Sequence, residues 1–383
     1  MSPPWKTLLG LAVVLHRPVM TLLTLPGETG VTSLYALADI NGLMAGSKRG
    51  AVYCVDRQEE ATGTSNLQLR ELPLPLEGDD PVRTPNPYPI YCMTSNDSQN
   101  TLFCGGGDRY VTVWVRQDDG NWRQKQRLGP HTGWVKDVWY DSHNHVLNSI
   151  GCNCIETWKQ RENNDNDDNQ QGVWKHWKHC SIESSVSEAA TLSSDLLCLC
   201  PAVAVGFFLA GGVDGRIHLW NSELGQPVAS VAAHVGRVNA MILAPKCRLF
   251  FSGSHDGTIK CWLMDADANT LPRTAAATLS VEEDARVTAM TCIKDGSTNA
   301  VRVFFGTQNG LIGLALAKKA ATGGVDFVLQ RTVHLEGGPT IHALAVLSCT
   351  HDGKASNTPT TLAVGHSLGL TNLQINQRCF NVN

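Results

Sequence analysis

Five side chains of metal-ligating type lie within one short segment, residues 151–180. They are Cys152, Cys154, His176, His179 and Cys180. A structural zinc site usually joins two ligands that are two to four residues apart to a second close pair. Cys152 and Cys154 are separated by one residue, and simple alternation along a strand puts His176 and His179 on opposite faces. We therefore predict that these residues hold no metal.

The acidic run between these cysteines and histidines could instead bind calcium. Asp165, Asp167 and Asn169 match the first three ligands of an EF-hand loop. However, Gln170 stands where that loop needs Gly, and His176 stands where it needs Glu. Without the sharp turn and the bidentate carboxylate, a solvated loop is the better interpretation.

The sequence does not favour an enzyme. No phosphate-binding loop with a Gly-Lys-Ser/Thr ending occurs. The Gly-rich segment from Cys104 to Arg109 joins two predicted strands, so it offers no helix N-terminus to a phosphate. We predict no catalytic residue and no cofactor.

Composition points to a repetitive all-β chain. The 383 residues include 35 Gly and 10 Trp, and only 17% are charged, which is typical of short strands joined by tight turns. The net charge of −4 argues against a broad nucleic-acid or anionic membrane footprint. The 13 cysteines are an odd number and several lie in apolar runs, so we expect buried thiols in an intracellular, cytoplasmic or nuclear protein.

One unit recurs seven times, and its clearest copy is Leu249–Trp262. An apolar run ends in a small residue and Gly, a polar turn follows, and a second run ends in Trp, which predicts a β-hairpin. The predicted hairpins cover residues 43–55, 102–114, 146–158, 208–220, 249–262, 303–315 and 362–374.

Two positions recur in every predicted hairpin. The first, at the start of the turn, is occupied in chain order by Gly46, Gly105, Ser149, Gly211, Gly253, Gly306 and Gly365. Four residues later, where we expect a positive φ angle, stands Gly50, Arg109, Asn153, Gly215, Gly257, Gly310 or Gly369. A short apolar strand precedes each hairpin and is expected to be innermost, beginning at Val31, Ile90, Val135, Leu196, Val238, Val287 or Ile341.

These repeats resemble the WD-repeat β-propeller family over nearly the whole chain. The resemblance implies a seven-bladed propeller and, in each regular blade, a hydrogen-bonded His, Ser/Thr, Asp and Trp tetrad. The best match is His234, Ser252, Asp256 and Trp262. A second set is His131, Ser149, Asn153 and Trp158, with Asn in place of Asp. Asp214 and Trp220 keep half of a set, and no Trp is followed by Asp.

The ring is expected to close with the N-terminal strand 19–25, which completes the seventh blade. Residues 19–383 then form the propeller and residues 1–18 an N-terminal extension. The apolar run from Leu8 to Leu15 is too short to span a bilayer, and organelle targeting remains an alternative for this extension. Five longer segments are expected to be inserted loops: 59–89, which is Pro-rich, 159–172, 265–284, 318–338 and 349–360.

A partner is expected on the face where the inner strands begin, called the narrow face below. The residues just before these strands are Gly30, Pro89, Trp134, Asp195, Arg237, Arg286 and Thr340. Trp and Arg are enriched at interface hot spots, so Trp134, Arg237 and Arg286 are the candidates for holding an acidic or phosphorylated peptide or a protein loop. Packing of Trp134 against a neighbouring loop is the alternative.

We therefore predict a non-enzymatic interaction scaffold that is a subunit of a hetero-complex. Two alternatives are a substrate receptor of a ubiquitin ligase and an RNA-binding or ribosome-associated propeller. The first usually shows Asp-x-Arg after the blade Trp, whereas Trp220 is followed by Asn-Ser-Glu and Trp262 by Leu-Met-Asp. The second is disfavoured by the near-neutral charge.

Overall fold

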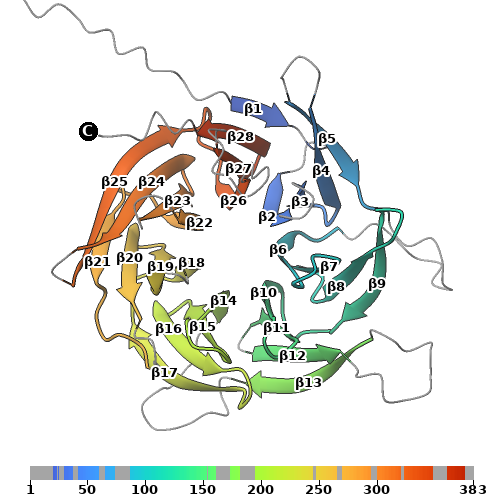
Figure 1. The fold of residues 1–383 in the computed structure, drawn as a ribbon, viewed down its shortest axis with the longest axis horizontal. Coiled ribbons are helices and arrows are strands. Elements are labelled where there is room, and N and C mark those ends of the chain that lie inside the picture. Colours follow the sequence, from blue (N-terminus) through green and yellow to red (C-terminus); the bar gives the residue numbers. More distant parts are fainter. Residues whose placement is uncertain are drawn as a thin grey trace, which may run out of the picture.

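The computed structural model describes residues 20–23, 25, 30–37, 42–59, 65–73, 87–152, 154–160, 173–181, 195–244, 247–264, 270–294, 300–320, 323–347 and 360–375. In this part of the chain 28 strands form seven four-stranded antiparallel sheets arranged as a ring (Figure 1). The predicted all-β, seven-bladed propeller is confirmed. No helix among the described residues has the length and apolar character needed to cross a membrane.

Each sheet, or blade, runs from a strand near the ring axis to a strand at the rim (Figure 1). The inner strands are β2 (Val31–Leu37), β6 (Ile90–Ser95), β10 (Val135–Asp141), β14 (Leu196–Pro201), β18 (Val238–Ala244), β22 (Val287–Lys294) and β26 (Ile341–Leu347). The second strands are β3 (Gly42–Ser47), β7 (Thr101–Gly106), β11 (Val146–Gly151), β15 (Phe207–Gly212), β19 (Leu249–Ser254), β23 (Val301–Thr307) and β27 (Thr360–His366).

The third strands are β4 (Val52–Glu59), β8 (Val111–Arg116), β12 (Cys154–Gln160), β16 (Arg216–Asn221), β20 (Thr258–Leu263), β24 (Leu311–Lys319) and β28 (Gly369–Ile375). The outer strands are β5 (Ser65–Glu71), β9 (Trp122–Leu128), β13 (Trp174–Ser181), β17 (Gln226–Ala232), β21 (Ala277–Ser280), β25 (Val325–His334) and β1 (Met20–Leu23). Blades 1 to 7 are numbered from the blade of β2 to the blade of β26.

Glycines at the ends of the second strands let neighbouring blades approach each other. A Cβ added to Gly253 would lie 2.6 Å from Cγ1 of Val287, the first residue of the next inner strand. The same clash arises for Gly46, Gly105, Gly211, Gly306 and Gly365. In blade 3 the equivalent residue is Ile150 rather than the predicted Ser149, because its turn is one residue shorter. The repeated Gly therefore has a packing function between blades.

The turns adopt the expected backbone conformation. The φ angle is positive at Gly50, Arg109, Gly215, Gly257, Gly310 and Gly369. In blade 3, Asn153 lies outside the described residues, and Cys152 directly before it has a φ of 53°. These residues reverse the chain between the second and third strands.

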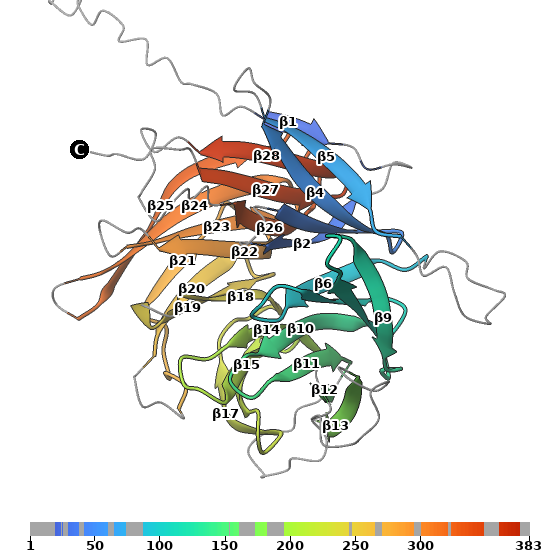
Figure 2. The same ribbon diagram turned by 45° about the vertical axis from the view of Figure 1, so that its right-hand side comes forward.

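The N-terminal strand β1 lies beside β28, on the rim of blade 7 (Figures 1 and 2). Met20 pairs with Leu373 and Leu23 with Leu370 in an antiparallel register. The predicted extension, residues 1–18, lies outside the described residues.

Three of the predicted inserted loops are partly strands, so that expectation was wrong there. Segment 59–89 contains β5, segment 265–284 contains β21, and segment 318–338 contains β25. All three are outer strands that pair with the third strand of their own blade. The other two segments lie almost wholly outside the described residues.

Candidate partner-binding face

The residues that precede the inner strands occupy equivalent places around the ring. In six blades the carbonyl oxygen of this residue accepts a hydrogen bond of 2.9–3.0 Å from the turn between the second and third strands. These residues are Gly30, Pro89, Asp195, Arg237, Arg286 and Thr340. The positions predicted from the sequence, together with those turns, therefore form one face of the ring, which is the narrow face.

Trp134, Arg237, Arg286 and Asp195 are all exposed on this face. The Trp134 side chain is 52% exposed, so only part of its ring packs against the protein. Arg286 Nη1 lies 3.3 Å from Gln308 Oε1, and Arg237 has no carboxylate partner among the described residues. Both guanidinium groups can therefore bind a carboxylate or phosphate from outside.

Two further residues of this site, Tyr91 and Lys136, were missed in the sequence. The Lys136 ammonium lies 4.6 Å from the ring centroids of both Tyr91 and Trp134, and those centroids are 5.9 Å apart. Burial lowers the pKa of Lys136, Asp195 raises it in opposition, and Arg237 lowers it. Asp195 and Arg237 are therefore within electrostatic range of this cation–π group.

A backbone irregularity explains how Tyr91 and Lys136 reach Trp134. In every blade the pairing of the inner and second strands skips the second residue of the inner strand. At this bulge Thr32, Asn239 and Thr288 each bond to the next inner strand through its first carbonyl, at 2.5–2.7 Å. Tyr91 and Lys136 occupy the same position in blades 2 and 3. The signal in the sequence was their place directly after the first residue of an inner strand.

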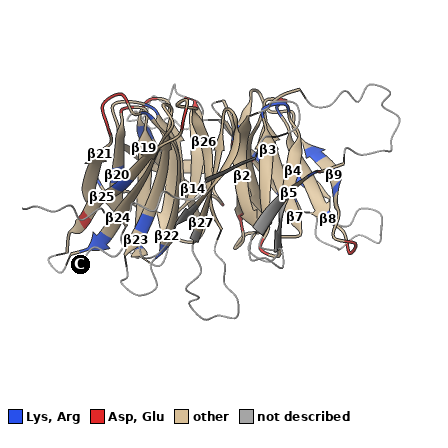
Figure 3. Cartoon of the chain, turned by 90° about the horizontal axis from the view of Figure 1, so that it is seen from above, with Lys and Arg blue, Asp and Glu red and all other residues tan. Residues whose placement is uncertain are grey.

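His255 lies within electrostatic range of both arginines. Its pKa is lowered by burial and then by the charges of Arg237 and Arg286. We define the narrow-face patch as Tyr91, Trp134, Lys136, Arg237, His255 and Arg286. Exposed apolar side chains add to this surface: Val213 and Leu368 lie in the turns between second and third strands, and Tyr88 and Val235 lie two or three residues before an inner strand. In the edge-on view of Figure 3 the Lys/Arg and the Asp/Glu stretches of the described residues are short and of both signs. The exposed acidic residues Glu282, Glu283 and Asp284 directly precede Ala285 and Arg286.

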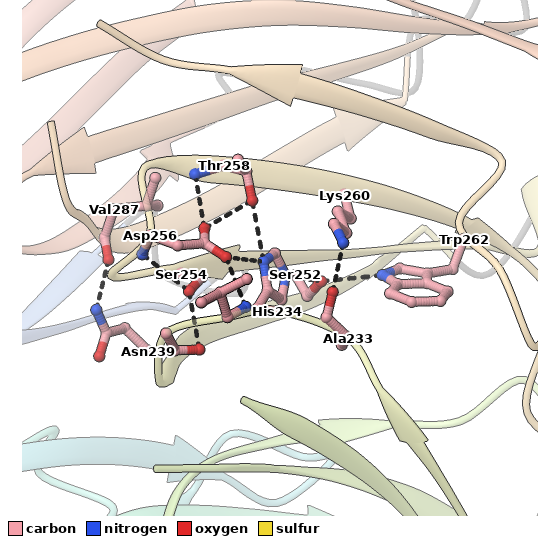
Figure 4. Close-up of polar contacts among 12 residues, drawn as sticks. Ala233, His234, Asn239, Ser252, Ser254, Asp256, Thr258, Lys260, Trp262 and Val287 are labelled. Carbon is pink, nitrogen blue, oxygen red and sulfur yellow. Dashed lines mark hydrogen bonds and ion pairs between the residues drawn. The ribbon is translucent and has the colours of Figure 1, made fainter. Parts of the chain in front are cut away.

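The four residues of the better predicted tetrad are in contact in blade 5 (Figure 4). Trp262 Nε1 donates to Ser252 Oγ at 2.9 Å, and Ser252 Oγ lies 2.7 Å from His234 Nε2. His234 Nδ1 lies 3.1 Å from Asp256 Oδ2. Burial lowers the pKa of His234 against the opposing effect of Asp256, so a neutral ring donates to Asp256 and accepts from Ser252.

In blade 3 the Trp, Ser and His of the second predicted tetrad are in contact in the same way. Trp158 Nε1 donates to Ser149 Oγ at 2.9 Å, and Ser149 Oγ lies 2.7 Å from His131 Nε2. His131 Nδ1 lies 3.2 Å from the carbonyl oxygen of Arg109. The fourth member, Asn153, lies outside the described residues.

In blades 2 and 4 the tetrad is incomplete, because the Ser that bonds to the Trp indole is replaced. Cys104 and Ala210 stand at the Ser position, and the buried Nε1 atoms of Trp114 and Trp220 have no hydrogen-bond partner among the residues that the structure describes. Asp214 accepts a bond from the backbone N–H of Arg216 at 3.0 Å and so closes its own turn.

The strand β13 contradicts the predicted alternation of His176 and His179. The β12–β13 register pairs Thr157 with Lys178 but Trp158 with His176, so Trp177 is an extra, bulged residue. The bulge puts both histidines on the side of Glu156: His176 Nε2 lies 2.6 Å from one carboxylate oxygen and His179 Nδ1 2.6 Å from the other. Burial alone would raise the pKa of Glu156, but the bonds from His179 and His176 hold it below its usual value.

The sequence also contains a Gly-x-Ser-x-Gly motif, residues 365–369, which reads Gly-His-Ser-Leu-Gly. A nucleophile elbow with this spacing needs a turn from a strand into a helix. Here the motif joins β27 to β28, and His366 Nε2 lies 2.8 Å from Thr371 Oγ1 rather than beside Ser367. The arrangement does not support a nucleophilic serine.

Comparison with known proteins agrees with this geometry. The family described as "WD domain, G-beta repeat" matches residues 80–115 and 225–262. Nuclear distribution protein PAC1 of Arthroderma benhamiae is 23% identical over 210 residues, 54% of this chain and 43% of that protein. The Ribosome biogenesis protein WDR12 homolog of Chlamydomonas reinhardtii is 36% identical over 63 residues, 16% of this chain and 14% of that protein.

A third relative is the human Serine-threonine kinase receptor-associated protein, 32% identical over 56 residues, which are 15% of this chain and 16% of that protein. The chain thus matches less than half the length of each of these relatives. The matched family segments include β6 to β8 and β17 to β20, and the second contains the complete tetrad. Together with the seven blades, these matches show that the chain contains WD repeats and has the fold of a seven-bladed β-propeller.

Proposed function

We propose that this chain is a non-enzymatic interaction scaffold that holds an acidic segment of a partner protein on its narrow face, as a subunit or adaptor of a larger assembly. The observation that carries the proposal is the narrow-face patch, where the half-exposed Trp134 lies beside the Lys136 ammonium. Arg237 is within electrostatic range of Lys136, and both Arg237 and Arg286 are within electrostatic range of His255. The name of one relative describes association with a kinase receptor, which supports a protein partner.

The patch combines two kinds of contact. Trp134 offers a rigid apolar surface already ordered by Tyr91 and Lys136, so little conformational entropy is lost on binding. Arg237 and Arg286 can each form a bidentate pair with a carboxylate or a phosphate. Asp195 lies at the edge of the patch and disfavours ligand anions that approach from its side.

Affinity purification of the full chain tests the proposal. The double variant Arg237→Glu, Arg286→Glu is expected to lose a partner that the unaltered chain recovers, by about tenfold or more. Arg273→Glu, Arg331→Glu is the matched control, because both residues are exposed and the charge change is the same. Equal recovery with both double variants would contradict the proposal.

Two treatments of the lysate define the ligand. Loss of the partner after phosphatase treatment identifies phosphate as the anion, and retention identifies carboxylates. Two relatives have names that refer to ribosome biogenesis and to U3 snoRNP, so an RNA bridge must be tested as well. Recovery that disappears after ribonuclease treatment would replace the protein partner with RNA.

A further inference from the structure

Blade 3 brings together three metal-ligating side chains of different chemistry. The Cys154 Sγ, a Glu156 carboxylate oxygen and a His179 ring nitrogen all lie within 4.8 Å of one another. Cys154 and Glu156 are on β12, and His179 is on β13 directly opposite Glu156. Cys154 is two residues before Glu156 and therefore on the same face of the strand.

The position of the group suits a bound ion. Cys154 is buried, at 4% exposure, and its thiol lies 3.4 Å from Thr132 Oγ1. Glu156 is 8% exposed, whereas the His179 side chain is 47% exposed. The group thus has a buried sulfur at its base and an imidazole at its open side, so a water molecule or a partner's side chain can reach a fourth position.

The other blades provide an internal comparison. In blade 5 the equivalents of Cys154, Glu156 and His179 are Thr258, Lys260 and Thr278. In blade 4 they are Arg216, His218 and Ser230. Neither set can coordinate a metal through three side chains. The combination in blade 3 is therefore not required by the propeller fold.

A hydrogen-bonded His-Glu-His group is the simpler interpretation of Glu156, since both of its oxygens accept from a histidine. That interpretation leaves the adjacent Cys154 thiol as a buried donor to the carbonyl oxygen of Gly151, at 2.9 Å, and this bond is lost when the thiol ionises to bind a metal. We propose that Cys154, Glu156 and His179 bind Zn²⁺ through sulfur, oxygen and nitrogen, with His176 bonded to the second Glu156 oxygen.

Zinc accepts all three donor types. Tetrahedral bonds of about 2.0–2.3 Å separate ligand atoms by roughly 3.3–3.8 Å, so the Glu156–His179 pair opens by about 1 Å when the ion enters. His176 then orients the ligating carboxylate from outside, as hydrogen-bond partners of metal ligands commonly do.

Titration of the full chain with Co²⁺, followed by displacement with Zn²⁺, tests this site. We expect one equivalent of Co²⁺ with tetrahedral ligand-field bands and a thiolate-to-cobalt charge-transfer band. Cys154→Ser should abolish the charge-transfer band, and His179→Gln should weaken Zn²⁺ affinity at least tenfold. His176→Gln should weaken the affinity by about 10–100-fold with the charge-transfer band retained.

Cys152→Ser and Cys180→Ser are the matched controls, because each removes a neighbouring thiol outside the group. Both should keep the charge-transfer band. Absence of stoichiometric Co²⁺ binding by the unaltered chain, or a charge-transfer band that survives Cys154→Ser, would overturn the proposal. If Cys154→Ser fails to fold by circular dichroism, the His179→Gln variant, altered at the exposed rim, decides the result: unchanged Zn²⁺ affinity rejects the site.

Discussion

Trp262 donates its indole N–H to Ser252 Oγ in blade 5, and this hydrogen bond is missing at the equivalent Trp220 of blade 4. Trp220 stacks on Phe208 and Trp262 stacks on Phe250, with ring centroids 6.2 Å and 5.5 Å apart, so each indole packs against a Phe in the second strand. The difference is Ala210, which occupies the position of Ser252. A buried N–H without a partner destabilises the fold by about 1–3 kcal/mol.

We therefore predict that Ala210→Ser raises the free energy of unfolding by about 1 kcal/mol, since the new hydroxyl accepts from Trp220. Chemical denaturation measures this. Ala45→Ser is the control, because Ala45 is equally buried but the Trp position of blade 1 is Val55. The control should be neutral or destabilising, and an equal gain in both variants would contradict the explanation.

Close packing between blades predicts the effect of adding one methyl group. Gly253→Ala places a Cβ 2.6 Å from Val287 and 3.0 Å from Met290, and should lower the free energy of unfolding by about 1–3 kcal/mol. Gly324→Ala, where no atom of the described residues lies within 4 Å of the added Cβ, should change it little. Thermal unfolding of both variants checks the prediction, and equal melting temperatures would reject it.

The buried His218 makes stability depend on pH. Burial lowers its pKa to about 4, with Asp214 acting in the opposite direction. An unfolded histidine titrates near 6.5, so between roughly pH 6.5 and 4 the unfolded chain takes up a proton that the folded chain does not. The contribution to stability is complete above pH 6.5 and falls as the pH drops, by about 3 kcal/mol in total.

His218→Leu should remove this dependence, because neither ring nitrogen of His218 has a hydrogen-bond partner to lose in the described part of the chain. Compared with the unaltered chain, the variant should lose about 2 kcal/mol less stability between pH 7.5 and 5. The control is His143→Leu, which removes an exposed histidine ring by the same substitution. Parallel profiles for the His218 variant and the unaltered chain would contradict the assignment.

Strand β1 predicts a sharp difference between two truncations. Deleting residues 1–28 removes β1 and exposes the edge of β28, so we expect loss of soluble folded protein. Deleting residues 1–19 keeps β1 and should preserve the melting transition. Size-exclusion chromatography and thermal unfolding compare the two. An unchanged transition after the longer deletion would show that β1 does not hold the ring closed.

Local signals in the sequence were sufficient to predict the positions of the hairpins. A small residue, a polar turn and a residue with positive φ recur at fixed spacing, because each blade must reverse the chain in the same place. Outer strands lack such signals. β21 alternates exposed and partly buried residues, and β25 has exposed or partly buried residues at eight of its ten positions, so both resembled loops.

Which residues come together in the narrow-face patch and in the blade 3 metal site depends on strand pairing and blade contacts that the sequence does not show. The bulge at Trp177 reverses the facing of His179 relative to simple alternation, and it arises from the register against β12. Lys136 joined Tyr91 and Trp134 because neighbouring inner strands lie side by side, although the residues come from blades 2 and 3. Contacts between blades could not be predicted, because they join residues that are far apart in the sequence.

The most direct measurement of the central claim is site-specific photocrosslinking from the narrow face. A photoreactive amino acid at position 134 should crosslink to the partner recovered by affinity purification, and the crosslink should disappear when Arg237 and Arg286 are changed to Glu. The same group at Leu224, 61% exposed in a turn on the opposite face, should give no crosslink to that partner. A crosslink from position 224 but not from 134 would contradict the account.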